Sequence, residues 1–173
     1  MAKRMAIDTQ ERYILLGSRK GLLQRPLPPR VSVCRDRSDV EAEMKRPTKG
    51  KLWISFSRNA TDILLKKALA FRAQFRGSHL ITLTPPRSES IPALQGLFHP
   101  VFGLVEGFQW LPEKELVEVI AREDASSRFI GGCVDLKAKT LTLLRGDMTA
   151  VIAPFATFQK SGMGRHRILR NFD

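Results

Sequence analysis

The sequence predicts an α+β fold with a central βαβ unit over residues 52–84 and a C-terminal antiparallel meander. Two observations predict the βαβ unit. Two apolar segments flank a third segment that has helical periodicity, and all three segments lie within residues 52–84. A third predicts the meander, because short alternating segments separated by turn residues follow residue 128. The alternative is a three-layer α/β sandwich with a mostly parallel sheet.

The first strand is expected at 52–57 (LWISFS), which is rich in β-branched and aromatic residues. The segment 58–77 follows with a helical period; Asn59 or Thr61 can cap the start of its helix, and Gly77 suits the position directly after the helix. Its predicted inward stripe has helical spacing and comprises Leu64, Ala68, Phe71 and Phe75. The next strand is expected at 78–84 (SHLITLT), parallel to the first because a helix connects them.

The segments before residue 51 are less regular. We expect a short strand at 31–34, and one or two helical turns over 38–46 capped by Ser38. RPLPPR at 25–30 excludes a regular helix, because proline lacks the amide proton. The predicted organisation is a basic, proline-containing and partly disordered arm (1–50), a single α+β domain (51–160) and a basic tail (161–173).

The second half begins with an extended segment at 101–110, followed by a helix over 112–124. That helix places Leu116, Val117 and Ile120 inward. The meander strands are expected at 128–136, 140–146 and 148–155.

The charge of the chain favours an anionic partner. The net charge is +12 and the isoelectric point is about 10.4. We therefore expect an accessory or regulatory protein that binds DNA or RNA non-specifically through phosphate contacts. The expected contacts lie in the arm and tail: Arg19, Lys20, Arg25, Arg30, Arg165, Arg167 and Arg170.

The alternative function is a nucleotide- or phosphometabolite-binding α/β domain, with or without enzymatic activity. Its site would be the loop between the first strand and helix of the βαβ unit, because a helix N-terminus favours anions. The candidate residues are Ser57, Arg58, Asn59 and Thr61. The loop lacks a glycine-rich fingerprint and a Walker lysine.

No catalytic residue, metal site or cofactor is expected. His79, His99 and His166 share no metal-ligand spacing with one another, and no nucleophile elbow is present. Cys34 and Cys133 lie far apart, which suits a reducing, cytoplasmic location. No apolar run approaches the roughly 20 residues of a membrane span, so no membrane association is expected.

One further pattern lies near the end of the chain. FIGGCVDL (129–136) and LTLLRGDMTAVIAPFATFQKSG (141–162) resemble a strand-turn-strand signature of uncharacterised bacterial proteins of unknown function. The resemblance implies a cytosolic accessory domain and supports the meander. It assigns no chemistry to any residue.

Overall fold

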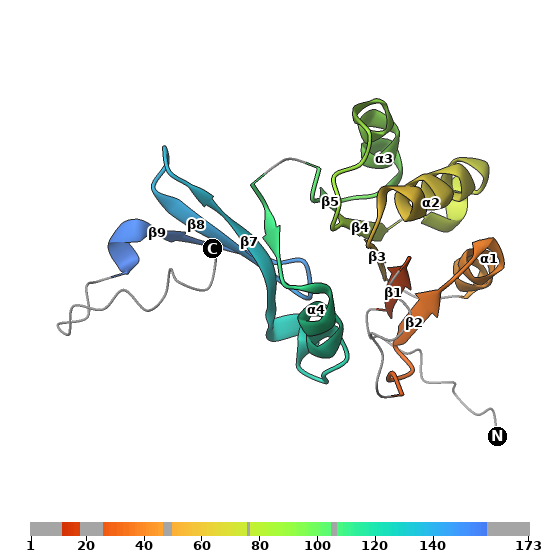
Figure 1. Cartoon of the computed structure of the whole chain (residues 1–173), viewed down its shortest axis with the longest axis horizontal. Coiled ribbons are helices and arrows are strands. Elements are labelled where there is room, and N and C mark those ends of the chain that lie inside the picture. Colours follow the sequence, from red (N-terminus) through yellow and green to blue (C-terminus); the bar gives the residue numbers. More distant parts are fainter. Residues whose placement is uncertain (1–11, 18–25, 47–49, 76, 105–106, 159–173) are drawn as a thin grey trace, which may run out of the picture. The chain divides into compact units, whose positions relative to one another are not determined.

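The computed structural model describes residues 12–17, 26–46, 50–75, 77–104 and 107–158. The chain divides into two compact units, residues 1–106 and 107–173, whereas the sequence analysis expected one domain over 51–160. The first unit contains a parallel sheet with helices and the second an antiparallel sheet, so the predicted α+β class is confirmed (Figure 1). None of the described helices is long and apolar enough to cross a membrane.

The first unit is built on a five-stranded sheet in which every neighbouring pair is parallel. The strand order is β2-β1-β3-β4-β5. The strands are β1 (Arg12–Leu16), β2 (Val31–Cys34), β3 (Lys51–Ser55), β4 (Ser78–Thr82) and β5 (Val101–Phe102). The predicted βαβ unit is present as β3 and β4, with the intervening helix between them.

Two strands and a helix occupy the range that was expected to be an arm. β1 lies between β2 and β3, and Tyr13 to Leu16 are almost fully buried within it. The short strand expected at 31–34 is β2. The described part of 1–50 therefore belongs to the sheet unit, because β1 supplies one of its inner strands.

Three helices join the parallel strands and cover one face of the sheet. They are α1 (Arg37–Lys45), α2 (Arg58–Ala70) and α3 (Ile91–Leu97) (Figure 1). Their apolar residues share one core with alternate residues of β1, β3 and β4. At its centre the Phe75 ring lies 5.4 Å from the Trp53 ring and 5.4 Å from the Phe98 ring.

The predicted inward stripe of α2 is right for Leu64, Ala68 and Phe75 but wrong for Phe71. The helix ends at Ala70, and Phe71 has φ −130° and ψ 48°. This break in the helical period turns Phe71 outward, where 42% of it is exposed. A 3₁₀ turn, η1 (Arg72–Phe75), then returns the chain to the core.

The caps also differ from expectation. Ser57, rather than Asn59 or Thr61, is the N-cap of α2, and its side chain accepts a hydrogen bond from the Ala60 amide. The N-cap of α1 is Asp36 rather than Ser38, since the Asp36 side chain accepts from two amides of the first turn. In both helices the capping oxygen lies further towards the N-terminus than the sequence pattern indicated.

A buried ionic cluster attaches α1 to the start of the sheet. Arg12 Nε donates to Glu43 Oε2 at 2.8 Å, and Lys51 Nζ donates to the backbone oxygens of Glu43 and Met44. Burial alone raises the pKa of Glu43. Hydrogen bonds from Arg12 and Ser32 outweigh that effect, so the pKa lies below its usual value. Burial lowers the pKa of Lys51.

The second unit contains a four-stranded antiparallel sheet in the order β6-β7-β8-β9. The strands are β6 (Gln109–Trp110), β7 (Phe129–Asp135), β8 (Thr140–Arg145) and β9 (Ala150–Pro154). The extended segment expected at 101–110 is two short strands, because β5 pairs in the first sheet and β6 in the second. The predicted meander is β7 to β9.

One helix and a 3₁₀ turn precede β7. The helix is α4 (Glu113–Ile120), and its predicted inward residues Leu116, Val117 and Ile120 are buried. The turn is η3 (Ala125–Ser127).

Between β8 and β9, Met148 has a positive φ of 67°, a conformation that a residue with a β-carbon adopts at a cost in free energy.

Replacing Phe75 tests the core assignment. Phe75→Ala should lower the free energy of unfolding by about 3–5 kcal/mol, because it leaves a cavity between Trp53 and Phe98. Phe71→Asp should stay within about 1 kcal/mol of the parent, because Phe71 is exposed. Urea unfolding measures both variants, and a severe loss in Phe71→Asp would contradict the assignment.

Glu43 should make stability depend on acid pH. Because its pKa is lowered in the folded chain, its contribution is present above the unfolded pKa and is lost as the pH falls through the folded pKa. Glu43→Gln should therefore unfold more easily than the parent by about 2 kcal/mol at pH 7. The difference should shrink below about pH 4. Urea midpoints across this range measure the effect. A similar loss in Glu89→Gln, an exposed control, would argue against this role.

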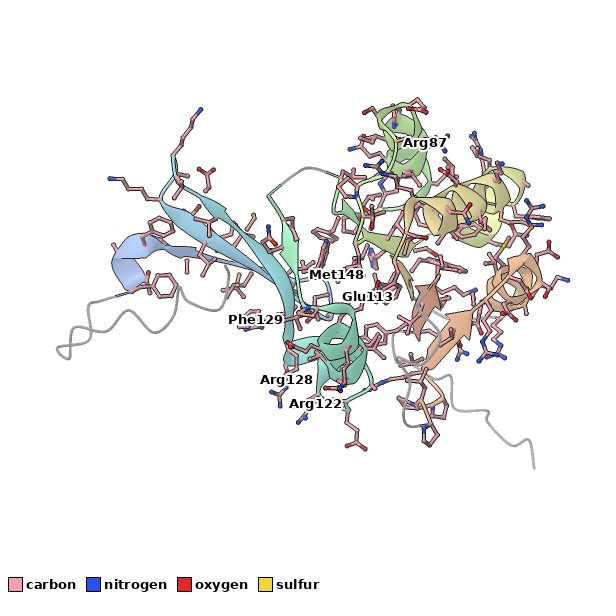
Figure 2. All side chains as sticks on the ribbon, in the orientation of Figure 1. Arg87, Glu113, Arg122, Arg128, Phe129 and Met148 are labelled. Atoms are coloured by element: carbon pink, nitrogen blue, oxygen red, sulfur yellow. The ribbon has the colours of Figure 1, made fainter. Side chains whose placement is uncertain are left out.

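The turn at Met148 should be stabilised by glycine. Met148→Gly should raise the free energy of unfolding by about 0.5–1 kcal/mol, because glycine adopts positive φ without the steric penalty. Met148→Ala keeps a β-carbon in the same conformation and should give no gain. Thermal unfolding distinguishes the two variants, and equal stabilities would contradict the argument. Figure 2 shows the position of Met148.

Candidate functional site

The strand order of the first sheet creates a candidate ligand position at the carboxyl ends of its strands. The chain leaves β1 towards β2, but it leaves β3 in the opposite direction, towards β4. In doubly wound sheets of the order 2-1-3-4-5, ligands bind outside the carboxyl ends of the strands where the direction reverses. Here that position lies between the ends of β1 and β3, at Leu16 and Ser55.

The N-terminus of α2 lies at this position. Ser57 Oγ accepts from the Ala60 amide at 3.3 Å, and the Thr61 amide donates to the Ser57 carbonyl oxygen at 3.0 Å. Among the described residues, no acceptor pairs with the amides of Arg58 and Asn59. These two amides and the positive end of the helix dipole favour an anion.

Gly17 brings the end of β1 against the start of α2. Its φ is +72°, and a β-carbon there would lie 2.9 Å from Ala60 Cβ and 3.3 Å from Ser57 Oγ. Only a residue without a side chain fits this approach. Gly17 was not among the predicted site residues, although a glycine directly after an apolar run is a signal that could have identified it.

The four residues predicted for the phosphate loop fall into two groups. Ser57, Arg58 and Asn59 lie in the first turn or cap of α2, and Arg58 and Asn59 are exposed. Arg58 Nε donates to the Pro85 carbonyl oxygen at 2.9 Å, which connects this loop with the loop after β4. Thr61 is buried and its hydroxyl donates to Ser55 Oγ at 2.8 Å, so its hydroxyl is directed into the protein.

Of the predicted nucleic-acid contacts, only Arg30 lies within the described residues. It is partly buried next to β2, and its carbonyl oxygen accepts from the Tyr13 amide at 2.9 Å. The other six contacts lie outside the described residues: Arg19, Lys20, Arg25, Arg165, Arg167 and Arg170. Their role stays a prediction.

The positive charge is unequally divided between the two units. Counting described residues only, the first unit has 12 Lys/Arg and six Asp/Glu, and the second has six and seven. Arginine and aspartate are paired in the second unit: Arg128 Nε donates to Asp124 at 2.8 Å and Arg122 Nε at 3.0 Å (Figure 2). Hydrogen bonds from Arg128 and then Arg122 lower the pKa of Asp124 to about 2. Asp124 therefore stays ionised and neutralises part of the charge of both arginines.

Burial, and then the charge of Glu43, raise the pKa of Cys34 to about 12, so its thiol stays protonated and unreactive at neutral pH. Within the described residues, no group of three or more His, Cys, Asp or Glu side chains is placed to hold a metal ion. The candidate site is therefore an anion position without an assigned catalytic group.

Comparison with known proteins identified no relative of this chain. No protein-family model matches the chain, and neither a curated protein nor a solved structure matches it significantly.

Proposed function

We propose that the first unit binds a small phosphorylated ligand, a nucleotide or a phosphometabolite, at the carboxyl ends of β1 and β3. The observation that carries the proposal is the reversal of strand direction between these two strands, with the N-terminus of α2 beside it. Gly17 supports the proposal, because the missing side chain leaves the backbone of β1 close to the start of the helix.

A phosphoryl group matches the polar groups available there. The amides of Arg58 and Asn59 can donate to phosphate oxygens, and the α2 dipole stabilises the negative charge. The nearest acid along the helix is Asp62, which has its own partner, since Arg87 lies 3.7 Å from it. Asp62 therefore repels an incoming anion less than a free carboxylate would.

The ligand should contact the protein through one phosphoryl group rather than a triphosphate chain. The 57–61 loop has no glycine in its sequence and no Walker lysine, which are the features that enclose di- and triphosphates. One helix N-terminus with two available amides suits a single terminal phosphate. Such a group occurs in nucleoside monophosphates and in sugar phosphates.

Ligand stabilisation tests the proposal. At ten times its dissociation constant, a bound ligand raises the free energy of unfolding by about 1.4 kcal/mol, which corresponds to a Tm increase of a few degrees. Inorganic phosphate and AMP should each give such an increase. Arg58→Gln should reduce the increase, because the variant removes the one positive charge in the first turn of α2.

Two variants complete this experiment. Gly17→Ala should abolish the ligand-induced increase, because the added β-carbon would lie 2.9 Å from Ala60 Cβ. Lys114→Gln alters an exposed lysine on α4, outside the first unit, and should leave the increase unchanged. No stabilisation of the parent by millimolar phosphate or AMP, or an equal reduction in Lys114→Gln, would overturn the proposal.

A further inference from the structure

The outer surface at the C-terminal end of α2 combines exposed apolar side chains with unpaired positive charge. Leu69 and Phe71 are each 42% exposed, and Lys66 and Arg72 beside them in the sequence are also exposed. Among the described residues of the first unit, Leu69 and Phe71 are the only exposed large apolar side chains.

The charge of this surface has one sign. From the residue after Asp62 to Phe75 at the end of η1, the chain contains Lys66, Lys67 and Arg72 and no acidic residue. The helix α1 packs against both α2 and η1, and Lys45 in its last turn adds another exposed cation at the same end of the sheet. We name Lys45, Lys66, Leu69, Phe71 and Arg72 the α2-end patch.

The acids near the α2-end patch have other partners. Glu41 forms an ion pair with Lys67, and Glu43 is buried between Arg12 and Arg46. No described acidic residue forms an ion pair with Lys45, Lys66 or Arg72. The positive charges of Lys66 and Arg72 are therefore available to an external anion, whereas Glu41 offsets part of the charge of Lys45.

We infer that the α2-end patch binds single-stranded nucleic acid. Lys45, Lys66 and Arg72 would contact phosphates, and the Phe71 ring would stack on a base, which is the pairing of cations and aromatic faces that single-strand binders use. A duplex is disfavoured because its bases are stacked on one another and offer no free face to the ring. This inference is independent of the phosphate site, which lies at the opposite end of α2.

An acidic protein segment is the competing partner, and the apolar area argues against it. An amphipathic helix needs a groove lined by several apolar positions about one turn apart. The patch offers two neighbouring apolar side chains, Leu69 and Phe71, and no further exposed large apolar side chain in the described part of its unit. One ring with flanking cations suits a base and its phosphates better than a helix.

The binding experiment uses the full chain and a fluorescently labelled oligo-dT of 12 nucleotides. Phe71→Ala should weaken binding about tenfold, within the range for loss of one stacked base, and Phe71→Trp should restore it. Phe129→Ala is the matched control, since Phe129 is 43% exposed but lies in the second unit, beneath Arg145 (Figure 2). It should leave the affinity unchanged.

Salt dependence tests the phosphate contacts separately. Lys66→Gln and Arg72→Gln should each reduce the slope of log affinity against log salt by about 0.7, the value for one phosphate of a single strand. Lys114→Gln, an exposed lysine on α4, is the control and should not change the slope. Thermal unfolding of each variant should match the parent, because all the altered side chains are exposed.

Four results would overturn the inference. The first is no binding of oligo-dT at 50 mM salt, and the second is an affinity that does not change in Phe71→Ala. The third is an equal loss in Phe129→Ala. The fourth is displacement of the oligonucleotide by poly-glutamate at equal charge concentration with the same dependence on Phe71, which would assign the patch to an acidic protein instead.

Discussion

The position of β1 between β2 and β3 is the constraint on which the first unit depends. Residues 13 to 16 are paired on both sides through parallel ladders and are almost fully buried. Because β1 occupies this inner position, the chain must leave β1 and β3 in opposite directions, and the candidate ligand site exists only where those directions diverge. Gly17 ends the strand at that point and allows α2 to begin against it.

The two ends of α2 have different chemical character. At its N-terminus, the Ser57 side chain pairs with the Ala60 amide, and no described acceptor pairs with the amides of Arg58 and Asn59. At its C-terminus, the break at Phe71 exposes a ring directly before the exposed Arg72. Both properties follow from where the helix starts and stops. The helix itself contributes Leu64 and Ala68 to the core, which keeps both ends fixed relative to the sheet.

Much of this description could be predicted from local patterns. The β3-α2-β4 unit and the β7-β9 meander were predicted because their hydrogen-bonding partners are close in sequence and their apolar periods are regular. Ser57 and Arg58 were selected for the same reason, since they stand directly before or at a helix start. Phe71 was assigned to the core because the helical period was extended past Ala70, where the helix ends. Gly17 was not selected, because its importance depends on Ala60, more than 40 positions away.

By itself, the sequence determined the α+β class, the inward residues of α4, the inward position of Leu64 and Ala68 on α2, and the excess of positive charge. These are local properties of composition and period. Only the tertiary structure decided that β1 and β2 join the sheet, that residues 101–110 divide between two sheets and that the sheet order reverses between β1 and β3. The physical reason is that pairing between strands distant in sequence depends on backbone hydrogen bonds, which every residue except proline can form, and on burial of whole faces. Neither leaves a local signal for which strand lies beside which.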